Sequence, residues 1–230
     1  MERSSATSSI KAALWQTSGF VAATLMAASV LSAQTPAGRW DAHVTIRSLR
    51  IPFTMHFDGS GSSFTAFLVT GDTRIRSSSA SFDGKTARAD FENPTSRMQA
   101  VVAEDGSLTG TFGNQKAGMH PFKASAFCTC GLVGEAGPEI MGSWEVSNDW
   151  KLSVRRVGED TFATISRGGA EIGPLSGRFN GSFFELSLFD GNQAAVLEIE
   201  PRKDGALDLS WIEPGVAAQK LKAMPAEKKP

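Results

Sequence analysis

Apolar and polar residues alternate along two neighbouring stretches near the start of the chain, residues 40–46 and 51–57. Alternation with a period of two places every second side chain on one face of a β-strand. The pattern therefore predicts two strands joined by a turn at residues 47–50, with Trp40 opposite Phe57 so that apolar residues meet across the hairpin. The predicted buried face consists of Trp40, Ala42, Val44, Ile46, Ile51, Phe53, Met55 and Phe57.

Turn-forming dipeptides separate further runs that are rich in Val, Ile, Phe and Thr. Asp-Gly and Asn-Gly supply the positive backbone φ that tight hairpin turns require. No stretch after residue 34 carries a long helical period, so we expect an all-β chain with about eight short antiparallel strands in each half. The six dipeptides begin at Asp58, Asp83, Asp105, Asn180, Asp190 and Asp204.

The chain contains two copies of one pattern. Gly38–Asp41 opens the first copy with Gly-x-Trp, and Gly142–Glu145 opens the second in the same way; Ser81–Gly84 is then matched by Arg178–Gly181. Each Gly-x-Trp resembles the first strand of lipocalin-like and avidin-like barrels. An internal duplication of this kind predicts two consecutive antiparallel meander domains, either small barrels or curled sheets, with a β-sandwich as the competing solution.

Composition suggests how the chain is divided. A charged start followed by the apolar run Phe20–Leu31, too short to span a bilayer, is typical of a secretory signal peptide. We therefore expect an exported protein, periplasmic or extracellular, without a membrane span in its mature chain. The expected segments are a signal peptide at 1–33, a first β domain at 34–127, a Gly-rich linker at 128–139, a second β domain at 140–223 and a disordered tail at 224–230.

Charge and motif content exclude several function classes. The formal net charge is -1 and Lys and Arg are scattered among Asp and Glu, so no basic stripe is available for nucleic acid. The sequence has no Gly-x-Ser-x-Gly, no His-Glu-x-x-His and no phosphate-binding Gly-rich loop before a helix. We therefore expect neither an enzyme nor a bound cofactor.

The mature chain as a whole resembles a known family. Ala37–Asp41, Gly106–Gly113 and Pro121–Ala124, then a Gly/Ala-rich joint and a second Gly-x-Trp, follow the order seen in the duplicated N-terminal β region of exported acidobacterial TlpA-type thioredoxin-like proteins. In that family a thioredoxin-fold domain with a Trp-Cys-x-x-Cys centre follows. This chain contains no such centre, so the family's reductase activity transfers to none of its residues. The resemblance implies a periplasmic accessory module whose partner is a small ligand or a protein, such as a thioredoxin-fold protein.

Cys128 and Cys130 are the first candidate site. A Cys-x-Cys pair in an exported protein could exchange with thiols or capture a soft metal such as Cu(I). The structural alternative is a pair of linker cysteines, joined in an inert bridge or linking two chains. Thiol-disulfide exchange or soft-metal binding is accordingly the alternative to a non-enzymatic binding module.

Asp41, His43 and His56 are a second candidate. In the predicted hairpin register these residues share the outer face and His56 lies opposite Asp41, and two imidazoles with one carboxylate can hold a divalent metal. The alternative is a solvated sheet face.

Four tryptophans form a third candidate. They alternate with apolar residues on faces predicted to point inward, where a barrel that binds a hydrophobic molecule carries aromatic rings. Packing of the core is the alternative. The residues are Trp40, Trp144, Trp150 and Trp211.

Overall fold

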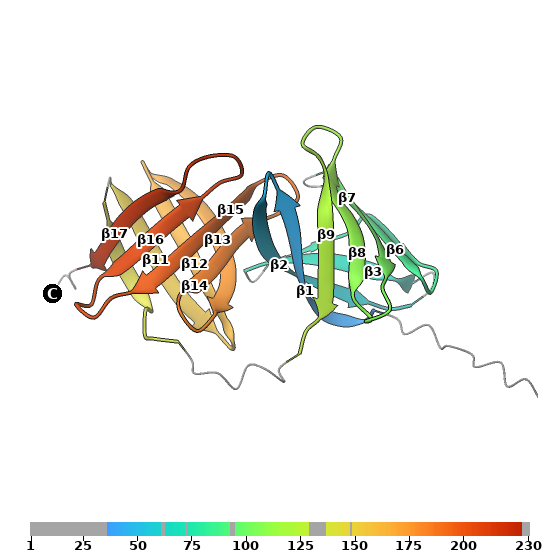
Figure 1. Ribbon diagram of the computed structural model, residues 1–230, viewed down its shortest axis with the longest axis horizontal. Helices are drawn as coiled ribbons and strands as arrows, with labels where there is room; N and C mark the ends of the chain where they lie inside the picture. Colours follow the sequence, from blue (N-terminus) through green and yellow to red (C-terminus); the bar gives the residue numbers. More distant parts are fainter. Residues whose placement is uncertain are drawn as a thin grey trace, which may run out of the picture. The chain divides into compact units, whose positions relative to one another are not determined.

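Two antiparallel sheets make up the computed structural model, which describes residues 36–60, 63–71, 73–92, 95–128, 137–147 and 149–226 (Figure 1). The predicted signal peptide at 1–33, most of the predicted linker and residues 227–230 lie outside the described residues. All described residues fall within one compact unit.

The first sheet is built from nine strands of the described chain, in the order β4-β3-β2-β1-β9-β8-β7-β6-β5. The pairing of β1 with β9 curls it almost into a ring, which is interrupted between β4 and β5. There, the Ser77 amide donates to the Ala66 carbonyl of β3 and the Ser78 amide to the Asp90 carbonyl of β6, both at 2.8 Å. The strands are β1 Gly38–Ile46, β2 Leu49–Asp58, β3 Thr65–Thr70, β4 Thr73–Arg76, β5 Ser79–Phe82, β6 Thr86–Glu92, β7 Thr95–Val102, β8 Leu108–Asn114 and β9 Gly118–Ala126.

The second sheet is a closed barrel of eight strands within the described chain, each paired with its sequence neighbours and closed by the pairing of β10 with β17. Closure removes the exposed edges of an open sheet. The strands are β10 Gly142–Val146, β11 Trp150–Val157, β12 Asp160–Arg167, β13 Ala170–Phe179, β14 Phe184–Phe189, β15 Ala194–Pro201, β16 Leu207–Ile212 and β17 Gln219–Pro225.

The predicted fold class is confirmed, because the chain forms two consecutive antiparallel meanders, a curled sheet and then a barrel. The glycine of each of the six turn dipeptides has a positive φ and lies between consecutive strands. The duplication extends to hydrogen bonds. The Trp40 indole donates to the Pro36 carbonyl at 2.9 Å, and the Trp144 indole donates to the Ile140 carbonyl at 3.0 Å.

The predicted register of the first hairpin is wrong by two residues. Trp40 lies opposite Met55 rather than Phe57, because the turn contains two residues rather than four. Arg47 and Ser48 adopt positive φ values of 46° and 71°, as in the tightest hairpin turns. A shift of two keeps every side chain on its predicted face, so the inward pattern survives while the cross-strand partners change.

The predicted start of a disordered tail at residue 224 is also wrong. Met224 and Pro225 belong to β17 and pair with Glu145 and Trp144 of β10. The last strand must reach this far because its pairing with β10 closes the barrel.

Candidate functional site at the seam between the two sheets

The outer wall of the barrel is apolar where it meets the first sheet. Phe189 and Val196 point away from the barrel interior, yet both are buried and belong to the hydrophobic core of the first sheet. The Phe189 ring centroid lies 4.5 Å from that of Phe53 and 5.2 Å from that of Phe112. The core of the first sheet therefore contains side chains of both sheets, and the barrel interior has a core of its own.

The turn between β14 and β15 seals one end of the curled sheet. The Asn114 side-chain amide donates to the Gly191 carbonyl at 3.2 Å. A Cβ on Gly191 would lie 2.5 Å from the Ser96 hydroxyl oxygen, and the residue has a φ of 95°, so the close approach requires glycine. The β14–β15 turn of the second half thus packs directly against β7 and β8 of the first sheet.

The four candidate tryptophans are all buried, between 2% and 8% exposed. Trp40 packs edge-on against Phe57, with ring centroids 6.0 Å apart, and Trp150 packs edge-on against Trp211 at 6.1 Å. The arrangement is that of packed cores, since each ring lies against other core side chains.

An ion-pair cluster lies at the polar part of the seam. Asp160 of β12 accepts hydrogen bonds from Arg39 of β1 and Arg178 of β13, each at 2.8 Å. Arg178 also reaches Asp41 of β1 at 3.2 Å. Burial works to raise the pKa of Asp160, but the hydrogen bonds and charges of the two arginines outweigh it and hold that pKa below its usual value. We call these four residues the seam clamp.

Phe127, at the end of the first half, packs against the two arginines of the seam clamp. The guanidinium carbons of Arg39 and Arg178 lie 4.5 Å and 4.6 Å from the centre of its ring. Both distances are within the range of cation–π attraction. The residue that precedes Cys128 is thus held by both arginines.

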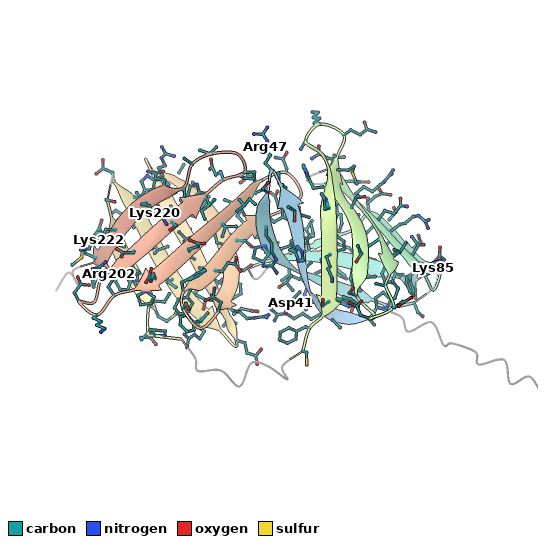
Figure 2. The ribbon with its side chains drawn as sticks, viewed as in Figure 1. Asp41, Arg47, Lys85, Arg202, Lys220 and Lys222 are labelled. Carbon is teal, nitrogen blue, oxygen red and sulfur yellow. The ribbon has the colours of Figure 1, made fainter. Side chains whose placement is uncertain are left out.

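A cavity of about 200 Å³ opens beside the seam clamp, between the outer faces of β1–β3 and β12–β14. Its apolar walls include Phe53, Val69 and Phe162. Its polar lining consists of Asp41, Arg50, Thr54, Asp160, Ser176, Arg178 and Glu185. Figure 2 shows Asp41 among the side chains at this seam. We call this hollow the seam cavity.

Arg50 and Glu185 face each other across the seam cavity from β2 and β14. Their closest nitrogen and oxygen atoms are 3.8 Å apart, which is longer than a hydrogen bond. Burial raises the pKa of Glu185, the positive charge of Arg50 opposes the rise, and the negative charge of Glu198 adds to it. Glu185 is therefore a carboxylate whose charge is poorly compensated in the fold.

A larger groove of about 490 Å³ lies on the outer face of the barrel at β15–β17. Three of its polar groups have partners: Lys220 Nζ donates to Ser210 Oγ at 2.5 Å, and Asp208 accepts from Arg202 at 2.6 Å. Figure 2 shows Arg202, Lys220 and Lys222 on this part of the barrel. Because these three groups already have hydrogen-bond partners, the groove is a weaker candidate than the seam cavity.

The chain matches no protein-family model, and comparisons with curated proteins and with solved structures find no match. The resemblance to TlpA-type proteins therefore stays a prediction. No helix among the described residues is long and apolar enough to cross a membrane.

The predicted metal-binding triad is not brought together, since the register that placed His56 opposite Asp41 is wrong. Instead His56 Nε2 lies 2.8 Å from Asp58 Oδ1, and Asp41 lies opposite Thr54 and contacts Arg178. Burial lowers the pKa of His43, and the charges of Arg50 and Lys123 lower it further. Within the described part of the chain, no three His, Cys, Asp or Glu residues form a group that could hold a metal.

The predicted cysteine pair is described in part. Cys128 is exposed and disulfide-bonded, and Cys130 lies outside the described residues. The first position of the pair therefore follows directly after Phe127, which contacts both arginines of the seam clamp.

The seam was missed by the sequence prediction, although a signal for it exists. Leu188-Phe189 and Ala194–Leu197 are consecutive apolar residues that break the alternation of a half-exposed strand. Such runs are typical of strands buried on both faces. They could have marked the outer wall of β14 and β15 as an interface.

Proposed function

We propose that the protein is an exported, non-enzymatic binding module that holds a small polar ligand in the seam cavity. The observation that carries the proposal is the location of this hollow. Charged and hydroxyl groups from both halves converge on it, whereas both sheet interiors are filled by the chain's own side chains. Concave sites with a few convergent polar groups are the usual ligand sites of proteins.

A hydrophobic ligand inside either sheet is disfavoured by packing. Phe189 and Gly191 occupy the end of the curled sheet, and Trp144, Trp150 and Trp211 belong to the packed core of the barrel. A ligand there would have to displace core side chains, which typically costs several kcal/mol, about 3–5 for a buried aromatic. The seam cavity requires no such displacement.

The size of the seam cavity limits the ligand. Drug-sized molecules occupy pockets of about 300–1,000 Å³. A volume of about 200 Å³ instead suits a small metabolite. A protein partner, including the thioredoxin-fold partner that the resemblance implies, stays a prediction without a surface assigned to it.

A cavity-filling variant tests the proposal. Thr54→Trp places an indole in the seam cavity, and Thr109→Trp adds the same side chain to the exposed outer face of β8. Ligand-observed NMR on the full chain would screen small carboxylates, amines, zwitterions, sugars and fatty acids. We expect small polar compounds to bind the wild type and Thr109→Trp and to lose binding in Thr54→Trp. Binding of fatty acids that Thr54→Trp leaves unchanged would contradict the proposal.

Thiol-disulfide exchange is the second candidate function, and the exposed, disulfide-bonded Cys128 favours it. Exposed disulfides are open to attack by a thiolate. On this alternative, the reduced full chain accelerates insulin reduction and Cys128→Ser abolishes the acceleration. Equal rates for the two proteins would rule it out.

A further inference from the structure

Most charged groups around the seam cavity already have partners. Asp160 accepts hydrogen bonds from Arg39 and Arg178, and Arg178 is shared with Asp41. These four charges sum to zero. The seam clamp is therefore a closed unit that gives a ligand little reason to bind there.

Arg50 and Glu185 are different. Neither side chain makes a hydrogen bond with any residue in the described ranges, and their mutual approach of 3.8 Å is too long for one. The Arg50 guanidinium has five N–H donors arranged as a planar fork, and an ionised Glu185 has only acceptor positions. The Glu185 side chain is 32% exposed, so much of its hydration has been lost without replacement.

Arg50 and Glu185 form only a long ion pair, and both face one cavity. Their free donor and acceptor positions are complementary to a molecule that carries both an acceptor and a donor charge. A carboxylate fits the guanidinium in a bidentate pair, and an ammonium donates to a carboxylate. A ligand with only one of these groups would leave either Arg50 or Glu185 without a hydrogen-bond partner. A ligand with both would satisfy the two at once.

We propose that the ligand of the seam cavity is a small zwitterion of the amino-acid class, with its carboxylate on Arg50 and its ammonium on Glu185. This inference rests on the proposed function. The hydroxyls of Thr54 and Ser176 line the same hollow and can bond to polar groups near the two charges.

The apolar walls of the cavity limit which side chain the bound amino acid can carry. Phe53, Val69 and Phe162 line the cavity beside its polar groups. Burial of a few methyl groups against them adds to binding, at about 0.8 kcal/mol for each CH₂. A volume of about 200 Å³ favours glycine, alanine or valine over amino acids with long or aromatic side chains.

Three molecules of nearly equal shape separate the contributions of the two charges. L-Alanine carries both, propionate carries the carboxylate alone, and isopropylamine carries the ammonium alone. Calorimetric or NMR titration of the full chain should show L-alanine binding at least about tenfold more tightly than either single-charge analogue, because each charge-assisted hydrogen bond adds to affinity. Glycine and L-valine extend the series in side-chain size.

Charge-neutral variants assign each group to its residue. Arg50→Gln should weaken L-alanine and propionate about tenfold or more and leave isopropylamine unchanged. Glu185→Gln should weaken L-alanine and isopropylamine and leave propionate unchanged. Arg88→Gln and Glu145→Gln, both at exposed ion pairs outside the cavity, are the matched controls and should leave every affinity unchanged.

The outcomes distinguish this inference from the proposed function. Propionate binding as tightly as L-alanine, or failure of glycine, L-alanine and L-valine to bind, overturns the zwitterion. If a sugar or another polar compound then binds and Thr54→Trp abolishes its binding, the proposed function stands without the zwitterion. If no polar compound binds in a manner sensitive to Thr54→Trp, both fail.

Discussion

The two halves of the molecule share an inward pattern and differ on their outward faces. Aligning the turn glycines Gly84 and Gly181 pairs Phe91 with Leu188, which are both buried core residues. The next residue is exposed Glu92 in the first half and buried Phe189 in the second. The repeat therefore preserves the residues that build each sheet, while the second copy carries an apolar outer wall that packs against the core of the first.

The fourth strand of the second half differs in the same way from its counterpart in the first half. β13 is continuous and pairs with both β12 and β14, whereas the corresponding part of the first half is divided into β4 and β5. The first copy is thus the less complete barrel. It is completed at one end by residues of the second copy, notably Phe189 and Gly191.

Exchanging the residue types at the equivalent positions 92 and 189 should have the largest effect on stability. Phe189→Glu puts a carboxylate into the shared core, and we expect it to lower the free energy of unfolding by about 3–5 kcal/mol or more. The reverse change, Glu92→Phe, lies on an exposed surface and should alter stability by less than about 0.5 kcal/mol. Urea unfolding of both variants measures the difference. Equal effects would show that the outer faces do not distinguish the halves.

Loss of the seam clamp should have the next largest effect. Asp160→Asn leaves Arg39 and Arg178 without their shared carboxylate, and we expect a loss of about 1–3 kcal/mol in urea unfolding. Asp208→Asn is the control on the barrel surface, where the exposed pair with Arg202 should contribute less than about 1 kcal/mol. A larger loss for Asp208→Asn would contradict the role given to the seam.

The pH dependence of stability provides a second test of Asp160. The folded-state pKa of Asp160 is lowered, so its contribution to stability is present above the ordinary pKa of 3.8 and is lost as pH falls through the lower folded value. Wild type should therefore lose stability in this acidic range more steeply than Asp160→Asn. Parallel pH profiles would mean that the carboxylate is not held as described.

The interruption between β4 and β5 predicts a difference in local stability. Amide hydrogen exchange should be about tenfold or more faster in β4 and β5 than at Ser176 and Gly177, which pair on both sides within β13. Mass spectrometry or NMR on the native chain measures this. Equal protection would mean that the first ring is closed in solution.

The smallest effect should come from Glu185. Its folded-state pKa is raised, so the associated stability is present below its ordinary value of 4.5 and is lost as pH rises through the raised value. Glu185→Gln should flatten that part of the pH profile, and Glu145→Gln, at an exposed pair with Lys151, should not. Unfolding midpoints across this range provide the measurement.

The sheets were predictable because their signals are local. Alternation in residues 40–46 and 51–57 gave the buried face of the first hairpin, and glycines such as Gly59 and Gly106 marked turns. The register was not predictable from these signals, because Arg47 and Ser48 adopt positive φ without the usual glycine or asparagine.

The seam was harder to predict because its contacts are distant in sequence. Arg39 and Asp160 are 121 residues apart, and Asp41 and Arg178 are 137 apart. Whether two outer faces meet depends on how complete sheets pack, which hairpin patterns do not encode. The apolar run at Ala194–Leu197 was the available local sign of a second buried face.

The shared core is tested most directly by the two equivalent tryptophans. The indole N–H groups of Trp40 and Trp144 make the same hydrogen bond in the two halves, so their NMR signals report each half separately. During urea unfolding of the full chain, we expect both native signals to disappear at the same urea concentration, because the core of the first sheet includes side chains of the barrel wall. Loss of the two signals at clearly separate concentrations would contradict a shared core and would make the halves independent domains.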